Sequence, residues 1–517
     1  MNNKILALII AVIIISPVAF AATASAQTTT STQARDIKIG LVCPYSKSPV
    51  GTDMYRAAQI AIQDINNAGG VYVSGWNTHV NMTIDLVDTV DDAPGNAVTP
   101  VTRAVTQDGV DLLIGGYGSA GTLANEVVAI QNRVPYIITG ASNQLVTRRG
   151  PQGNFGGLSP TDPQAVNDSV GMSYVFHYCT TTYQYSKTVV DFLATVMKPI
   201  VAADRNFSLA LLYRNDAFGN GVAAAAKYWI KNESLPISVV SDLSYPTTTT
   251  DFQTLLTEVK GAQPDAVFIA ENPDKSPTII TQGLNEVGLK TVYISVENNQ
   301  DPQFYSLLGS AGDMQLLESK LDPFMNPSYL ATITPFVQKY NASYGVAPGM
   351  MGADTYDAFF IAKAAIESAG TIDKAAVRTA IEQTNLPDSL LLTGNGKIQF
   401  STGVNYHEID VLTFMEQLKY NATLGQLKSI IVWPQNVSGV SLKQADFALP
   451  ADYPMASQSP TSTPTASPSS ASSVTPTATA SSQPTAAQDS TMLYIAAAVV
   501  VIVVVAVLAV VLLRKKK

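Results

Sequence analysis

The chain has 517 residues, a formal net charge of −9 and only 14% charged residues. A chain of this length is too long for one hydrophobic core, so at least two domains are expected. An acidic chain without a basic stripe does not suit nucleic acid, and we predict that it binds none.

Both ends of the chain carry apolar stretches. Residues 1–26 combine Lys4, an apolar run and small residues before Gln27, which is typical of a secretory signal peptide. An uncleaved N-terminal membrane helix is the alternative. Residues 492–513 are uncharged and would span about 33 Å as a helix, which is enough to cross a bilayer. The basic tail 514–517 then predicts a cytoplasmic C-terminus.

The segment 450–490 is mostly Ser, Thr, Pro and Ala, which predicts an extended stalk. We therefore predict a single-pass protein of the cell membrane whose binding domain is extracellular. Seven sequons fit a surface glycoprotein: Asn81, Asn167, Asn206, Asn232, Asn341, Asn421 and Asn436. Two cysteines, Cys43 and Cys179, could form a disulfide in an exported chain or remain two buried thiols.

Apolar runs and helical patterns alternate along the body of the chain. The first set of strands is predicted at 36–42, 80–87, 112–115 and 134–139, with helices at 53–68 and 123–131. A second set of strands is predicted at 207–213, 237–243, 266–270 and 292–296, with helices between them. Helices at 329–344, 356–369 and 373–383 and strands at 397–400, 409–416 and 427–432 follow. The alternation predicts two doubly wound, Rossmann-like α/β lobes with a ligand cleft between them.

The clearest unit runs from Leu112 to Ser142: a buried strand, a turn with three glycines, a helix and a second buried strand. It brings Ser119, Ser142 and the free N–H groups at the start of a helix to the edge where parallel strands end. Hydroxyl groups beside a helix N-terminus suit a small carboxylate or phosphate.

The same residues allow other kinds of site. Gly116–Gly121 satisfies G-x-G-x-x-G, but the acidic residue that a dinucleotide site needs about 20 positions later is missing. The turn at Ser119 nearly forms a nucleophile elbow, and His177 and His407 follow it, so a serine hydrolase is an alternative. Asp91-Asp92 is interpreted as a solvated acidic pair at a helix start, and we expect neither a metal site nor a cofactor.

The order of segments resembles the branched-chain (leucine/isoleucine/valine) amino-acid substrate-binding proteins of ABC importers, which have the type I periplasmic-binding fold. The resemblance covers most of residues 36–434. It is carried by short motifs, among them DINNAGG from Asp64, DGVDLLIGGYGSAGT from Asp108, NDAFG from Asn215, PDAVF from Pro264 and TYDA from Thr355.

The resemblance implies a role for each matching residue. Ser119 and Ser142 would bind the carboxylate of an amino acid. The carbonyl of Gly140 would accept from its ammonium group, and Glu297 would be the acidic partner of that group. Phe218 matches an aromatic residue of the cleft in the second lobe, whereas Asn272 stands where the family often has an aromatic. Tyr117, near a strand end, is the remaining ligand-binding candidate. Met351 is expected near the apolar end of the pocket.

The resemblance also implies an architecture and a function. Residues 36–178 with 322–395 would form one lobe and 179–321 with 396–449 the other, joined by a hinge. The protein would be a receptor, and not an enzyme, that delivers a small aliphatic amino acid to an ABC permease. An amide, urea or small organic acid is the alternative ligand, and a non-transport adhesion protein is the alternative function.

Overall fold

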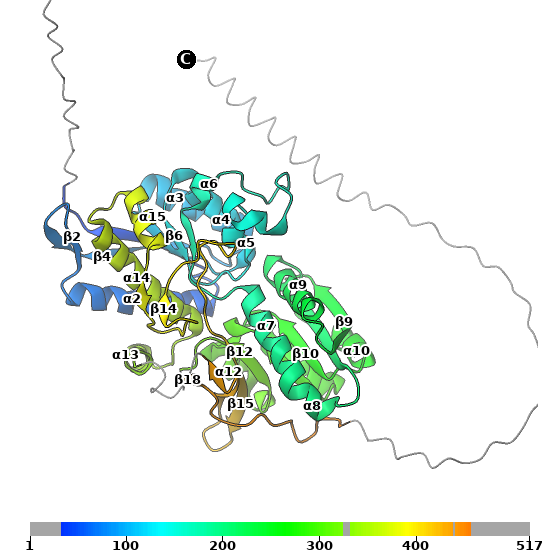
Figure 1. The fold of residues 1–517 in the computed structure, drawn as a ribbon. Helices are drawn as coiled ribbons and strands as arrows, with labels where there is room; N and C mark the ends of the chain where they lie inside the picture. The colour runs from blue at the N-terminus through cyan, green and yellow to red at the C-terminus, as the bar shows by residue number, and fades with distance from the viewer. Residues whose placement is uncertain (1–32, 324–330, 438–439, 456–517) are drawn as a thin grey trace, which may run out of the picture. The chain divides into compact units, whose positions relative to one another are not determined.

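The computed structural model describes residues 33–323, 331–437 and 440–455. These residues form two α/β lobes (Figure 1). The first lobe has a five-stranded parallel sheet in the order β4-β1-β5-β6-β7, and the second has a seven-stranded sheet in the order β16-β15-β12-β11-β10-β8-β9. The prediction of two parallel-sheet lobes is confirmed, although β15 runs antiparallel to both of its neighbours.

The elements of the first lobe alternate as the sequence predicts. Its strands are β1 (Ile37–Cys43), β4 (Met82–Asp88), β5 (Leu112–Gly115), β6 (Tyr136–Ile138) and β7 (Val175–His177). Its helices are α2 (Pro49–Asn67), α3 (Pro94–Arg103), α4 (Ser119–Asn132), α5 (Leu145–Arg148) and α6 (Ser169–Met172). Three later helices follow the second lobe's parallel strands: α13 (Ile333–Tyr344), α14 (Met350–Ala369) and α15 (Lys374–Glu382).

The second lobe repeats the pattern with longer strands. Its sheet contains β8 (Phe207–Arg214), β9 (Ile237–Tyr245), β10 (Ala266–Ala270), β11 (Val292–Ser295), β12 (Leu316–Ser319), β15 (Phe414–Asn421) and β16 (Gln426–Trp433). Its helices are α7 (Thr182–Phe192), α8 (Lys198–Val201), α9 (Ala217–Asn232), α10 (Gln253–Gly261), α11 (Ser276–Thr281) and α12 (Pro302–Leu308).

Three hairpins outside the two main sheets pair β2 (Val71–Val73) with β3 (Thr78–Val80), β13 (Leu386–Pro387) with β14 (Lys397–Ile398), and β17 (Asn436–Val437) with β18 (Val440–Ser441).

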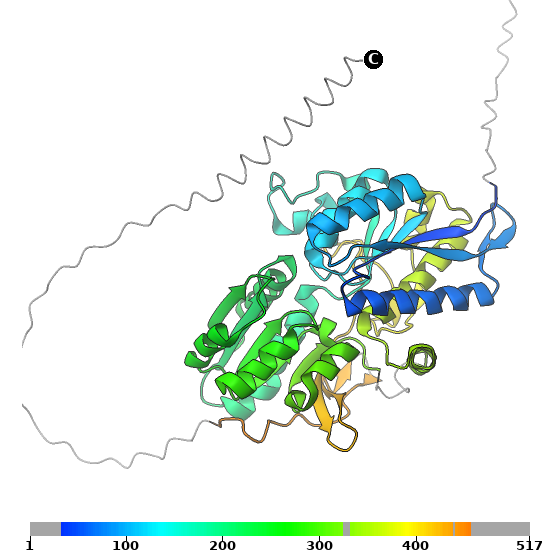
Figure 2. The same cartoon turned by 180° about the vertical axis from the view of Figure 1, so that it is seen from behind.

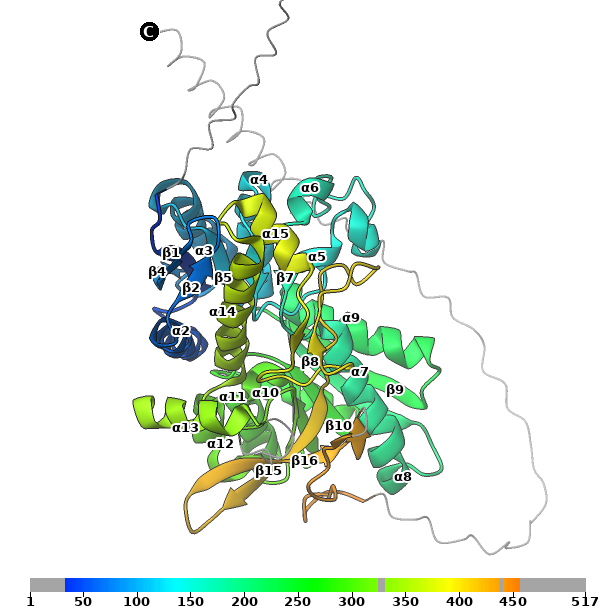
Figure 3. The same cartoon turned by 60° about the vertical axis from the view of Figure 1, so that its left-hand side comes forward.

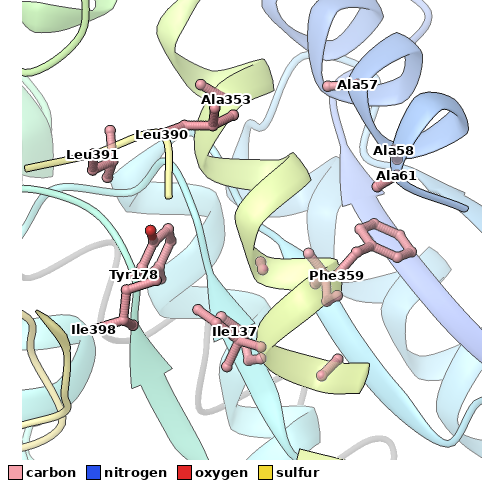
Figure 4. Packing of buried hydrophobic residues seen from close by; sticks show 14 of the residues in the cluster. Ala57, Ala58, Ala61, Ile137, Tyr178, Ala353, Phe359, Leu390, Leu391 and Ile398 are labelled. Carbon is pink, nitrogen blue, oxygen red and sulfur yellow. The ribbon is translucent and has the colours of Figure 1, made fainter. Parts of the chain in front are cut away.

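Both faces of the first sheet are covered, which explains its uninterrupted apolar strands. Side chains alternate along β1, so Ile39 and Leu41 join the core beneath α2 and α14, while Val42 joins the core beneath α3 and α4. Helix α14 lies against α2 (Figure 3). Small side chains on α2 face the large ring of Phe359 on α14 in this core (Figure 4). This packing attaches the returning helices to the first lobe.

The second sheet is covered in the same way. Helices α7 and α9 cover one face, and α10, α11 and α12 cover the other (Figure 2). Two segments of the chain that pass from one lobe to the other run side by side. The His177 N–H donates to the His407 carbonyl at 2.8 Å, and the Gln184 side-chain amide donates to the Ile409 carbonyl at 3.1 Å. Paired crossings of this kind can act as a hinge.

The structure contradicts a disulfide between the two cysteines, which are both free and buried. Cys43 ends β1, whereas Cys179 follows β7, and β5 and β6 lie between those strands. Three strand spacings separate the two positions by about 14 Å. A disulfide needs Cα atoms within about 7 Å, so the alternative of two buried thiols is correct.

The predicted signal peptide, most of the stalk, the transmembrane helix 492–513 and the basic tail lie outside the described residues. Within the described ranges, no helix combines the length and the apolar character that a bilayer crossing requires. All seven sequon asparagines are exposed, so each can be reached by a glycosylating enzyme. Whether they carry glycans stays a prediction.

Asp301 makes the stability of the protein depend on pH. Burial, and then the neighbouring Asp53, raise the pKa of Asp301 from 3.8 to about 7. The folded state therefore holds this proton between about pH 4 and pH 7 while the unfolded state releases it, so folding is favoured most below pH 4. The free energy of unfolding of the wild type should therefore fall as the pH rises from 4 to 7. Asp301→Asn keeps an oxygen for the Gln303 N–H but has no proton to release, so its free energy of unfolding should fall by about 2–4 kcal/mol less over the same pH range. Urea unfolding at pH 4, 5, 6 and 7 would measure it, and an unchanged slope would contradict it.

Candidate functional site

The carboxyl ends of strands from both lobes meet at one pocket of about 50 Å³. This volume suits a small solute, since a single water needs roughly 10–15 Å³. The pocket is lined by Asp91, Asp92, Tyr117, Gly118, Ser119, Ala120, Gly140, Ser142, Arg214, Asp216, Phe218, Asn272, Glu297, Asn298 and Met351. All seven residues predicted to bind a ligand are in this set, as is Met351. That they bind a ligand stays a prediction.

The first lobe contributes the start of α4. Gly115 ends β5 with a φ of 118°, and a Cβ there would lie 2.1 Å from the Val42 carbonyl oxygen, so the turn into α4 requires glycine. The turn places Ser119 at the first position of the helix, where backbone N–H groups have no partner within the helix. The Ser119 hydroxyl accepts from the Asn143 N–H at 3.2 Å, and the Ser142 hydroxyl lies 3.2 Å from the Tyr185 hydroxyl. Both serines are thus held in place by neighbours.

The second lobe contributes Glu297, which follows β11 and is only 1% exposed. The Lys320 Nζ lies 3.6 Å from Glu297 Oε2 and 2.6 Å from Asp354 Oδ2. Burial raises the pKa of Glu297, and the ammonium of Lys320 opposes that shift. Burial alone would lower the pKa of Lys320, but Asp354 and Glu297 raise it above its ordinary value. The carboxylate in the pocket wall is therefore supported from behind by a buried cation.

Three side chains join the lobes directly across the pocket. The Tyr117 hydroxyl donates to Asn272 Oδ1 at 3.1 Å, and Asn298 Nδ2 donates to the Tyr117 oxygen at 3.2 Å and to Asn272 Oδ1 at 3.1 Å. Asn143 Nδ2 adds a bond to the Ala217 carbonyl at 2.7 Å. These contacts join the two lobes in the closed arrangement of the structure.

Replacing Tyr117 by phenylalanine should shift the protein without ligand toward an open form. The variant loses two hydrogen bonds between the lobes, worth about 1 kcal/mol each, so the ratio of closed to open molecules falls by up to about 30-fold. Distances between spin labels on the two lobes would measure the shift, with Tyr228→Phe on an exposed face of α9 as the control. An unchanged distance distribution would show that the trio does not hold the lobes together.

The interpretation of Asp91-Asp92 as a solvated pair is wrong for Asp92. Asp91 is half-exposed and accepts from the Ala93 N–H and from Asn96, although the N-cap of α3 is Ala93 and no described side chain caps this helix. Asp92 is only 7% exposed and accepts from the Gly118 N–H at 2.5 Å and from the Thr89 hydroxyl. Burial raises the pKa of Asp92 from 3.8 to about 6. No local pattern indicates this, because Gly118 is distant in sequence.

Sequence reasoning also missed Arg214, Asp216 and Asn298. Arg214 Nε lies 2.6 Å from Asp216 Oδ2, and its Nη1 lies 3.0 Å from Glu271 Oε1. Asp216 also caps α9 by accepting from the Gly219 N–H at 2.9 Å. Asp216 belongs to the motif NDAFG, which follows a predicted strand. Ligands of open parallel sheets bind at the carboxyl ends of the strands, so this position was the sequence signal for Asp216.

The enzyme and dinucleotide alternatives do not fit this geometry. The ring of His177 bonds the Ala141 carbonyl, and that of His407 bonds the Val175 carbonyl and Glu382, so neither activates Ser119. A Cβ on Gly121 would lie 2.2 Å from the Asp92 carbonyl oxygen, so this glycine makes room for protein and not for a phosphate. Across the described residues, no group of three or more His, Cys, Asp or Glu side chains is arranged to hold a metal.

Two α/β lobes that present their strand ends to one small shared pocket define a solute-binding protein. The profile of the periplasmic binding protein family matches residues 36–416. The chain belongs to this family, whose members bind solutes and are not enzymes. The predicted family and the expectation that the chain is not an enzyme are confirmed.

Named relatives are similar to the chain over most of its length. Leu/Ile/Val-binding protein homolog 8 of Brucella abortus is 24% identical over 374 residues, which is 70% of this chain and 83% of the relative. The leucine binding protein LivK of Thermotoga maritima has a TM-score of 0.61 at 18% identity, covering 77% of this chain and 99% of its own. An ABC transporter solute binding protein of R. palustris, solved with benzoate, has a TM-score of 0.61 at 18% identity, covering 79% and 98%.

Proposed function

We propose that this protein is a receptor that captures a small amino acid in the pocket between its lobes and delivers it to an ABC importer. One observation carries the proposal: the pocket presents different chemistry from each lobe. The first lobe offers Ser119, Ser142 and the N-terminus of α4, which suit a carboxylate. The second lobe offers Glu297, which suits an ammonium group.

Ligand binding and lobe closure are then one event. A solute that touches Ser119 on one lobe and Glu297 on the other adds contacts only in the closed form, so it shifts the population toward closure. A permease that docks on both lobes would distinguish the loaded receptor by this shape. The hinge contacts around His177 and His407 are where the rotation would be absorbed.

Relatives support this transport role and widen the range of ligands. The relatives described above include a leucine binding protein and an ABC transporter protein in complex with benzoate. An aliphatic amino acid is the first candidate, and an amide, urea or an organic acid such as benzoate is the second. An adhesion protein that kept the fold without a ligand is the alternative of another class.

The cellular setting belongs to the same proposal. An export signal at residues 1–26, a stalk at 450–490 and a membrane helix at 492–513 would display the two lobes outside the cell, tethered above the permease. The exposed sequons, such as Asn81 and Asn341, fit an extracellular surface. Protease shaving of intact cells would test the orientation, because a protected body would contradict it.

A thermal-shift screen of the purified full chain tests the function. The probes are the aliphatic, polar and charged amino acids, simple amides, urea and benzoate. Binding at 100 times the dissociation constant adds about 2.7 kcal/mol to the free energy of unfolding, which raises the melting temperature by several degrees. A shift with an amino acid supports the receptor, a shift with benzoate alone changes the ligand class, and no shift with any probe favours the adhesion protein.

A further inference from the structure

The pocket carries an excess of negative charge. Among its described lining residues, the carboxylates are those of Asp91, Asp92, Asp216 and Glu297, and the one cationic side chain is Arg214. The guanidinium of Arg214 is already paired with Asp216 and with Glu271. Lys320 is fully buried behind Glu297 and is shared with Asp354, so it does not reach the solute. The Lys47 Nζ lies 3.8 Å from Asp91, so Asp92 is the one lining carboxylate without an ion-pair partner among the described residues, and a zwitterion with an apolar side chain leaves its charge uncompensated.

The chain's own carboxylate occupies part of the place that suits a carboxylate ligand. Asp92 Oδ2 accepts from the Gly118 N–H at 2.5 Å, directly before the first residue of α4. The fit is tight, because a Cβ on Gly118 would lie 2.8 Å from Asp92 Cβ. Any ligand bound at Ser119 therefore lies beside Asp92, where a second negative charge is repelled and a positive charge is attracted.

Unused acceptors in the second lobe point the same way. Asn298 Nδ2 donates to Tyr117 and to Asn272. The Oδ1 atom of Asn298 is buried and accepts no hydrogen bond from the described residues. Oε2 of Glu297 likewise has no hydrogen-bond donor there, since its ion pair with Lys320 at 3.6 Å is too long for a hydrogen bond. Buried acceptors without donors are costly, and N–H groups of a ligand would satisfy both.

We propose that the pocket selects a small amino compound with a net positive charge, such as a short diamino acid, and that Asp92 is the residue that makes the selection. One ammonium group bonds Glu297 and Asn298 Oδ1, and the second lies beside Asp92. The small volume restricts the ligand to a short chain. The inference rests on the proposed function of the same pocket and narrows its ligand.

Three probes of equal chain length test it on the full chain by titration calorimetry at pH 7. L-2,4-diaminobutyrate carries a net positive charge, L-norvaline replaces its second ammonium by a methyl group, and pentanoate has only the carboxylate. We expect diaminobutyrate to bind roughly 10-fold or more tightly than norvaline, and pentanoate to bind weakest. Norvaline binding as tightly as diaminobutyrate, or no binding of diaminobutyrate, overturns the inference.

A substitution isolates the role of Asp92. Asp92→Asn keeps an oxygen for the Gly118 N–H but removes the charge. The dissociation constants of diaminobutyrate and norvaline for this variant should therefore lie within about threefold of each other. Asp242→Asn, at an exposed surface pair with Lys227, should keep the wild-type ratio. An unchanged ratio in folded Asp92→Asn overturns the role of Asp92. The wild-type ratio decides the ligand class even if this variant does not fold.

The two proposals fail differently in these experiments. If leucine or norvaline binds and diaminobutyrate shows no advantage, the receptor proposal stands and the inference of a cationic ligand falls. If no amino acid of any charge binds, both fall together.

Discussion

Replacing Glu297 by alanine is expected to weaken amino-acid binding by about 30- to 5,000-fold, which corresponds to about 2–5 kcal/mol. The carboxylate is buried in the pocket wall, and its removal would leave the ammonium group of a bound amino acid desolvated without a charged partner. Lys320 keeps its pair with Asp354 at 2.6 Å, so the lobe should still fold.

Titration calorimetry with an amino acid identified in the thermal-shift screen would measure the change. Glu258→Ala, at an exposed position on α10, is the matched control and should bind like the wild type. If Glu297→Ala retains the wild-type dissociation constant, Glu297 does not contact the ligand. Melting temperatures without ligand would show whether the variant is folded.

Replacing Lys320 by methionine is expected to lower the free energy of unfolding by about 3–5 kcal/mol. Lys320 is fully buried, and its ammonium serves both Glu297 and Asp354. Burial already raises the pKa of Asp354 well above its ordinary value, and without the ammonium two buried carboxylates would face each other uncompensated.

Urea unfolding at pH 7 would measure this loss. Lys363→Met is the matched control, because Lys363 pairs with Glu367 at 2.6 Å on the partly exposed face of α14 and should cost less than about 1 kcal/mol. At pH 4 the deficit of Lys320→Met should shrink, since the carboxylates then accept protons. A variant as stable as the wild type would show that protonation compensates fully even at pH 7.

Together these two residues connect stability to binding. Glu297 faces the pocket on one side and Lys320 on the other, so its charge is held in place before any solute arrives. A preformed carboxylate lowers the cost of organising the site when the ligand binds. The ammonium of Lys320 opposes the rise that burial causes in the pKa of Glu297, and so favours the ionised form that pairs with an ammonium group.

Local patterns predicted much of this architecture. The stretch from Leu112 to Ser142 shows its strand, turn and helix through apolar spacing and glycines, and the structure has β5, α4 and β6 there. The later region was harder: the strand expected at 409–416 begins only at Phe414, and the residues at 397 and 398 pair in a separate hairpin. The apolar residues before Phe414 lie in the segment that passes between the lobes, where they do not pair with a strand of either main sheet.

The composition, the alternating periods and the small-residue turns of this chain determine its two parallel-sheet lobes and the edge at which Ser119 and Ser142 stand, because these depend on neighbours a few positions apart. Only the tertiary structure decides that Asp92 turns inward to Gly118, that Lys320 lies behind Glu297, and that Cys43 and Cys179 stay apart. The physical reason is that burial, ion pairing and distance are set by groups far along the chain, and no local pattern records which of them meet.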